Sequence, residues 1–262
     1  TDFSRVRNYL LAGQAANWRQ LIMLSRFNDP NVMSCFKRHA KSIAGQIKIR
    51  RKVAPDEATI SDVLVKIRQV FQRIPCQSLA TQADDRMAFF SNKVLPQILR
   101  LQQKHTLIYI PSYFDFVGIR NILLKKETDF VSVTEYARIS EVNRGRARFL
   151  QGRKPIMLYT GRAHYFLRHK IKGVRHVVMF GLPEHSEFYP LVMNMLSDGV
   201  ISSSSTSSMN KDYIDNNADQ DVPASCLALY TKYEAHALER IVGTAHCERM
   251  TKGEKGTYLF CS

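Results

Sequence analysis

The sequence predicts an α/β fold, in which a parallel sheet is covered by helices on both faces. Short apolar runs recur between turn-forming residues, at positions 21–24, 107–110, 130–133, 156–159, 177–180 and 227–230. Runs this short and uniformly apolar are typical of strands that are buried on both faces. Stretches with helical periodicity separate most of these runs, and such alternation is typical of parallel α/β sheets. With 262 residues, 45% of them hydrophobic, the chain can bury a full core.

Two helix starts support this fold, because each directly follows an apolar run. Ser112 with Asp115, and Thr231 with Glu234, place a hydroxyl and a carboxylate three residues apart. Such a pair can cap the free amides of a helix's first turn. Each predicted helix would pack against the sheet through an apolar stripe. The stripes comprise Phe116, Ile119 and Leu123, and Tyr233, Ala237 and Ile241.

Two further segments have clear local signals. Residues 84–103 are amphipathic, so we expect a helix there, interrupted at Pro96 because proline cannot donate the helical hydrogen bond. Residues 199–223 are rich in Ser, Asp and Asn and have too little apolar surface to offset their ordering entropy. They predict a mobile surface loop.

The net charge of +15 is concentrated in two windows. Residues 35–54 contain seven Lys and Arg and no acidic residue, and residues 138–175 contain eleven against the single Glu141. The windows contribute +17, so the rest of the chain, with 20 basic and 22 acidic residues, sums to −2. A solvated surface usually mixes both signs, whereas a field of one sign favours a polyanionic partner, above all nucleic acid.

The composition disfavours several classes of protein. No run reaches the roughly 18 to 20 consecutive apolar residues of a membrane span, and the first residues lack the pattern of a signal peptide, so we expect no membrane partner. The five cysteines are widely spaced. Because no Cys or His spacing is typical of a zinc site or a disulfide framework, we expect reduced thiols and no bound metal.

The order of segments after residue 105 resembles the second RecA-like domain of superfamily 2 RNA helicases. Residues 106–112 are similar to its opening strand, residues 144–160 to a helix and a strand ending in Thr, and residues 177–184 to the next strand and its turn. Upstream, residues 19–27 resemble the last strand of the first RecA-like domain. The implied parts are the end of a first RecA-like domain at 1–45, a linker and helix at 46–104, and a second RecA-like domain at 105–262.

Five strings narrow this resemblance to one family. They occupy residues 2–7, 68–73, 108–117, 181–185 and 238–243. Together they resemble the digestive organ expansion factor family, also called the U3 small nucleolar RNA-associated protein 25 family, which is nucleolar and belongs to the small-subunit processome. The resemblance implies a location in the nucleus and nucleolus. It also implies pre-ribosomal RNA, U3 snoRNA and other processome proteins as partners, with no DNA expected.

The same resemblance implies that the chemistry is lost. An active helicase hydrolyses ATP with a glycine loop that cradles phosphates and with arginines of its second domain. None of the twelve glycines opens such a loop, residues 161–168 depart from the helicase pattern, and residues 191–195 replace its arginine-rich stretch with Leu-Val-Met-Asn-Met. We therefore expect no enzyme and no cofactor. The alternatives are the C-terminal half of an active ATP-dependent RNA helicase, and a module that binds acidic tails of proteins.

Basic side chains of the second charge window form the predicted site. Arg144 and Arg148 are four residues apart and would share one side of a helix. Contacts to phosphates would give affinity without sequence choice. Tyr165 and Phe166 could stack on bases, although packing is the favoured role. The predicted nucleic-acid-binding residues are Arg144, Arg146, Arg148, Arg153, Lys154, Arg162, Arg168, Lys170 and Lys172, with no catalytic or metal-binding residue.

Overall fold

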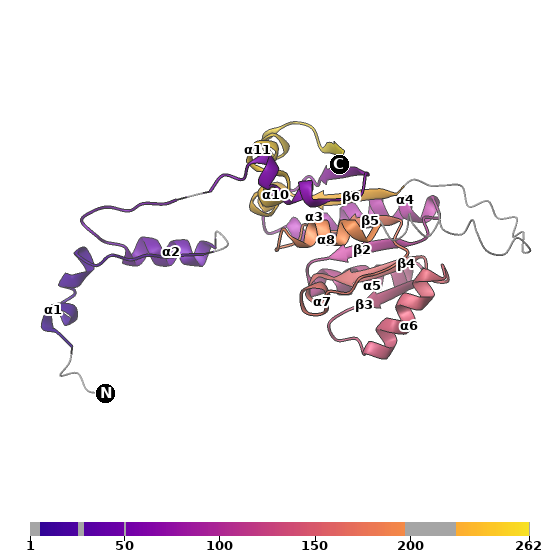
Figure 1. The fold of residues 1–262 in the computed structure, drawn as a ribbon, viewed down its shortest axis with the longest axis horizontal. Helices are drawn as coiled ribbons and strands as arrows, with labels where there is room; N and C mark the ends of the chain where they lie inside the picture. Colours follow the sequence, from indigo (N-terminus) through magenta and orange to yellow (C-terminus); the bar gives the residue numbers. More distant parts are fainter. Residues whose placement is uncertain (1–5, 26–28, 50, 197–223, 262) are drawn as a thin grey trace, which may run out of the picture. The chain divides into compact units, whose positions relative to one another are not determined.

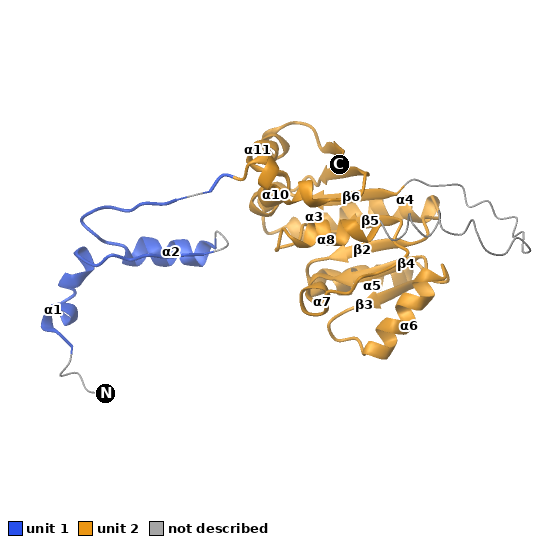
Figure 2. Cartoon of the chain, in the orientation of Figure 1, with its two compact units in different colours: residues 1–52 blue, residues 53–262 orange. Residues whose placement is uncertain are grey.

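The structure is a computed structural model that describes residues 6–25, 29–49, 51–196 and 224–261. The chain divides into two compact units, residues 1–52 and residues 53–262 (Figure 2). The loop predicted at 199–223 lies outside the described residues. Within the described part, no helix is long and apolar enough to cross a membrane.

The smaller unit contains short helical segments. They are α1 (Asn8–Leu11), η1 (Gln14–Asn17) and α2 (Pro30–His39). Helix α2 begins where its sequence favours a start, because Asp29 accepts a hydrogen bond from the amide of Asn31 at 2.7 Å and Pro30 occupies the first turn. The strand expected at 21–24 is wrong, since this segment is coil and Leu24 is 92% exposed. A strand needs a neighbouring strand, and the described residues of this unit form none.

The larger unit is built on a seven-stranded sheet with the order β3-β4-β2-β5-β6-β1-β7 (Figure 1). Every neighbouring pair is parallel except β1 with β7, which is antiparallel. The mostly parallel sheet confirms the predicted α/β fold class. The strands are β1 (Arg68–Arg73), β2 (Thr106–Ile110), β3 (Phe130–Val133), β4 (Ile156–Thr160), β5 (His176–Met179), β6 (Ser225–Tyr230) and β7 (Thr257–Cys261).

Helices cover both faces of this sheet and enclose two apolar clusters. One face carries α3 (Gln82–Phe89), the π-helical turn η4 (Phe90–Val94), α4 (Leu95–Arg100) and α5 (Tyr113–Lys125). The other carries α6 (Ile139–Leu150), α7 (Gly161–Leu167), α8 (Phe188–Met193), α10 (Ala235–Val242) and α11 (Thr244–Lys252). Successive residues of one strand point into different clusters, as Leu107 and Ile108 of β2 do, which explains why the central runs are apolar throughout.

Strand β1 lies in the range that was expected to be a linker and a helix. Its sequence contains only two apolar residues, yet Phe71 is fully buried and Gln69 accepts a 2.6 Å hydrogen bond from the buried hydroxyl of Tyr189. Helices α3 and α4 then pack on the sheet. The larger unit consequently begins at Val53, upstream of the boundary expected at residue 105.

The two predicted helix caps differ in outcome. The hydroxyl of Thr231 and the carboxylate of Glu234 form the expected capping box. The cap at Ser112 is wrong, because its side chain makes no capping hydrogen bond, although α5 begins at the next residue. Pro96 falls in the first turn of α4, directly after the π-helical turn, so the helix is interrupted where predicted.

The apolar stripe of α5 is confirmed, since all three of its members are buried. The stripe expected on the last predicted helix is partly wrong. Ile241 is buried, but Tyr233 is 38% exposed, and Leu238 and Val242 fill the core instead. A 3-10 turn, η7 (Lys232–Glu234), precedes α10 and changes the helical phase, so spacing counted from Tyr233 does not continue.

Candidate nucleic-acid interface

Helix α6 carries three of the predicted cations and is anchored to the sheet at strand β3. Its inner side consists of Val142, Gly145 and Phe149, all buried. A Cβ atom at Gly145 would lie 2.4 Å from Cγ1 of Val131, so glycine permits the close approach of helix and strand. The outer surface of α6 is thereby held in a defined position.

The three arginines of α6 do not share one side. At about 100° per residue, Arg144 and Arg148 lie roughly 40° apart on the exposed side, whereas Arg146 lies about 160° or more from both. Arg146 donates a hydrogen bond from its guanidinium to the carbonyl oxygen of Lys170. This contact joins α6 to the segment that follows α7 and brings Lys170 beside the helix.

Arg162 lies apart from this contact, at the carboxyl end of strand β4. The hydroxyl of Thr160 accepts a hydrogen bond from the amide of Ala163 at 3.2 Å and donates one to Glu135 at 2.9 Å. Glu135 is nearly buried, and its other oxygen lies 3.6 Å from Nε of Arg162. The carboxylate of Glu135 therefore partly compensates the positive charge of Arg162.

Two of the predicted cations lie over aromatic rings. The guanidinium carbon of Arg168 is 4.7 Å from the ring centre of Phe188, and that of Arg162 is 6.0 Å from the ring centre of Phe166. Phe166 is 61% exposed and Tyr165 is 50% exposed. Arginine over a ring gains a cation–π interaction and keeps other donors available for phosphate oxygens.

Beyond the end of α6, the predicted residues again differ in surroundings. Lys154 forms an ion pair with Asp129, just before strand β3, while Arg153 is exposed. Lys172 is also exposed. The structure thus brings Arg146 and Lys170 together and places the other predicted residues along α6 and its neighbouring loops, with Arg162 and Lys154 engaged by carboxylates.

His164 and His169 add no positive charge at neutral pH. Burial, together with the nearby charge of Arg168, lowers the pKa of His164 to about 4. Its Nδ1 lies 3.1 Å from the hydroxyl of Tyr159. Burial and then Arg146 lower the pKa of His169. The charge of the surface therefore comes from arginine and lysine.

The segment expected from the sequence to lack helicase arginines packs largely into the core. Residues 188–196 contain no Lys or Arg, and both Val192 and Met193 are fully buried. Asn194 accepts a hydrogen bond from the amide of Leu64 at 2.8 Å and donates one to the carbonyl of Asp62 at 3.2 Å. These hydrogen bonds hold the backbone of residues 62–64 in place, and they engage the side chain of Asn194 within the protein.

Comparison with known families decides the assignment. Residues 59–260 match the family described as Utp25, C-terminal domain, and residues 1–47 match the UTP25, NTP hydrolase-like domain. The chain belongs to the Utp25 family. This membership confirms the family predicted from the five short strings.

Curated relatives agree with this membership. The human U3 small nucleolar RNA-associated protein 25 homolog is 37% identical over 259 residues, which cover 99% of this chain and 32% of the relative. Protein NUCLEOLAR FACTOR 1 of Arabidopsis thaliana is 34% identical over 261 residues, covering 100% of this chain and 31% of the relative. The chain therefore spans about a third of the length of these relatives.

Solved structures give weaker matches. The Escherichia coli DEAD-box protein SrmB aligns with a TM-score of 0.44 at 14% identity, covering 68% of this chain and 85% of that chain. The C-terminal domain of the DEAD-box protein Dbp5 aligns with a TM-score of 0.42 at 12% identity, covering 72% and 87%. These TM-scores are too low to support a conclusion, so the family assignment rests on sequence similarity.

A second group of polar residues, which was not predicted from the sequence, lies at the carboxyl ends of strands β1 and β6. The cations Arg73, Lys232 and Lys252 meet there, although none of them belongs to a basic charge window. Their separation along the chain hides them from window counting. The available signal was position, because Arg73 ends a strand and Lys232 follows one almost directly. Within the described residues, no three His, Cys, Asp or Glu side chains converge as metal ligands would.

Proposed function

We propose that this domain is a non-catalytic nucleolar scaffold of the small-subunit processome. It binds pre-ribosomal RNA, U3 snoRNA and processome proteins, and it supports pre-rRNA processing and small ribosomal subunit biogenesis. Membership of the Utp25 family supports the proposal, as do the names of relatives, which associate them with U3 small nucleolar RNA or describe a nucleolar factor. The main structural support is the combination of two features: a basic helix, α6, that is anchored to the sheet, and an uncharged segment, 188–196, that packs into the core.

We expect no ATP turnover because of this segment. Arginines that reach a transferring phosphoryl group contribute about 10³ to 10⁵ in rate in related enzymes. Here Val192 and Met193 are held in the core, and the side chain of Asn194 is occupied by backbone groups. A nucleotide at this position would meet no cation from α8.

RNA affinity should depend on exposed cations of α6 and of the segment that follows α7. We expect the triple variant Arg144→Glu, Arg148→Glu and Lys170→Glu to bind RNA at least about tenfold more weakly at low salt, because three phosphate contacts become repulsive. The slope of log affinity against log salt should flatten by about 2, at roughly 0.7 per lost contact for single-stranded RNA. Fluorescence anisotropy across a salt titration measures both quantities.

A matched variant separates position from total charge. Arg120, Lys125 and Lys126 are exposed cations of α5 and the turn after it, on the other face of the sheet. Their reversal to Glu changes the net charge equally and should leave most of the affinity intact. Equal losses in both triple variants would contradict a localised interface.

In cells, the proposal predicts RNA contact without ATP consumption. Crosslinking of the tagged protein should recover pre-ribosomal RNA or U3 snoRNA, and the triple α6 variant should recover less. The purified full-length protein should show no RNA-stimulated ATP hydrolysis above the background of a mock preparation. Stimulated hydrolysis would overturn the scaffold proposal and favour an active RNA helicase. Intact activity in ribosome assembly without RNA crosslinks would favour a protein-binding module.

A further inference from the structure

A separate hollow of about 770 Å³ opens at the carboxyl end of strand β1. Its lining comes from the end of β1, the start of α3, the turn after β6 and the end of α11, and it includes Arg73, Cys76, Thr81, Asp85, Lys232 and Lys252. In open α/β sheets, ligands bind at the carboxyl ends of strands. Helix α6 contacts β3, which lies at the other end of the strand order from β1 and β7.

The hollow has a positive balance, with three cations and the single carboxylate of Asp85 among its lining residues. Arg73 makes hydrogen bonds within the protein, because its guanidinium donates to the carbonyls of Met250 at 3.2 Å and Thr251 at 3.1 Å. It thereby fixes the last turn of α11, which carries Lys252. No carboxylate of the described residues forms an ion pair with Lys252 or Lys232. The ammonium group of Lys232 lies 5.1 Å from the ring centre of Tyr233, a contact that leaves its charge without an acidic partner.

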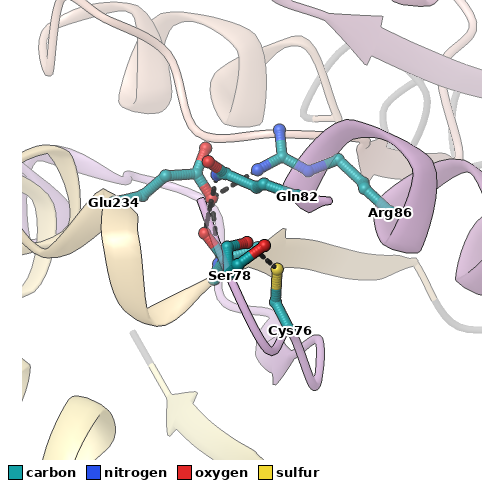
Figure 3. Close-up of polar contacts among 6 residues, drawn as sticks. Cys76, Ser78, Gln82, Arg86 and Glu234 are labelled. Atoms are coloured by element: carbon teal, nitrogen blue, oxygen red, sulfur yellow. Dashed lines mark hydrogen bonds and ion pairs between the residues drawn. The ribbon is translucent and has the colours of Figure 1, made fainter. Parts of the chain in front are cut away.

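Hydrogen bonds hold the polar wall of the hollow in place (Figure 3). The thiol of Cys76 donates to the carbonyl of Ser78 at 3.0 Å, and the hydroxyl of Thr81 donates to Asp85 at 2.9 Å. Asp85 is therefore already engaged as an acceptor. Thr81 makes no side-chain cap on α3, and the backbone amide of Gln82 at the start of this helix donates to the carbonyl of Leu79 at 3.4 Å.

A second set of contacts fixes α3 against the turn after β6. The side-chain amide of Gln82 donates to the hydroxyl of Thr231 at 2.7 Å, and Glu234 accepts from the backbone amide of Thr231 at 2.9 Å. Arg86 pairs with Glu234 at 2.6 Å. The position of Lys232 between Thr231 and Glu234 is consequently set before any ligand arrives, which lowers the ordering cost of binding.

The thiol of Cys76 is neutral at neutral pH, so it reacts slowly with alkylating reagents. Desolvation raises its pKa, and Asp85 raises it further, so at neutral pH it is a neutral hydrogen-bond donor. This excludes a thiolate nucleophile as the purpose of the hollow. What remains is a preformed space with two ammonium groups that have no acidic partner, beside the start of a helix.

We propose that this hollow binds a phosphate group, with Lys232 and Lys252 contacting its oxygens and the start of α3 facing it. Compact ammonium groups suit a multiply charged phosphate, and helix N-termini favour anions. The volume exceeds that of a phosphate ion and accommodates a nucleotide. The phosphate therefore belongs to a free nucleotide or to a phosphorylated end of RNA. This site is independent of the α6 surface and of the proposed scaffold function.

Cys76 provides a local reporter for the test. Alkylation of the intact protein by N-ethylmaleimide, mapped by mass spectrometry, follows Cys76 separately from the exposed Cys35 and Cys261. The probes are pyrophosphate, AMP, and one RNA 12-mer prepared with and without a 5′-phosphate. At a concentration ten times the Kd of an effective probe, alkylation of Cys76 should slow about tenfold, while Cys35 and Cys261 are unaffected.

Two variants make the result specific. The double variant Lys232→Ala and Lys252→Ala should abolish the protection of Cys76. The milder single variant Lys252→Ala should remove most of it. The triple α6 variant should retain it. Protection by pyrophosphate or AMP assigns a free nucleotide, and protection only by the 5′-phosphorylated RNA assigns an RNA end. Absence of protection by every probe at millimolar concentration, or equal protection in the double lysine variant, would overturn the site.

Discussion

The Arg86→Met variant should lower the free energy of unfolding by about 3 kcal/mol, because it removes one partner of a largely buried ion pair. Arg86 and Glu234 point toward one another and their closest atoms are 2.6 Å apart (Figure 3). The guanidinium also lies 5.8 Å from the ring centre of Phe180. Without it, Glu234 keeps its hydrogen bonds to Thr231 but loses the charge that compensates its desolvation.

Chemical denaturation measures this effect, and two comparisons test its cause. Adding Glu234→Gln to Arg86→Met should recover part of the loss, since no uncompensated charge then remains. Arg120→Met, at an exposed position of α5, should change the free energy of unfolding by less than about 0.5 kcal/mol. A cost below about 1 kcal/mol for Arg86→Met would show that water compensates Glu234 and that the pair contributes little.

The sequence predicted those strands whose residues are buried on both faces. Leu107 and Ile108 enter different apolar clusters, and this two-sided burial produces the continuous apolar run. Strand β1 escaped prediction because Gln69 is buried through a hydrogen bond to Tyr189, so a core position carries a polar residue. The run at 21–24 was misassigned because composition does not reveal whether a partner strand is present.

The candidate interface was predictable to the extent that its charges are close in sequence. The spacing of Arg144 and Arg148 correctly indicated a common side of α6, since four residues make about one turn. The direction of Arg146 depends on α7 and the loop after it, which spacing does not encode. The phosphate hollow could not be found in this way, because Arg73, Lys232 and Lys252 meet only through the sheet order.

Phe149→Ala should also have a large effect, lowering the free energy of unfolding by about 3 to 5 kcal/mol, because the vacated volume cannot be refilled by close-packed neighbours. Phe149 is fully buried under α6 and packs edge-to-face on His105, with ring centres 5.6 Å apart. Phe149→Leu retains much of the volume and should cost clearly less. Leu150→Ala, one residue along and 49% exposed, is the matched control and should cost about 1 kcal/mol or less.

The same variant tests whether the basic surface works as a rigid unit. If α6 presents Arg144 and Arg148 to RNA from a fixed position, Phe149→Ala should weaken RNA binding at a temperature where the variant is still folded, although no charge has changed. Circular dichroism establishes that temperature, and anisotropy gives the affinity. An affinity equal to that of Leu150→Ala, despite the larger loss of stability, would show that phosphate attraction alone is sufficient and that the packing of α6 has no part in binding.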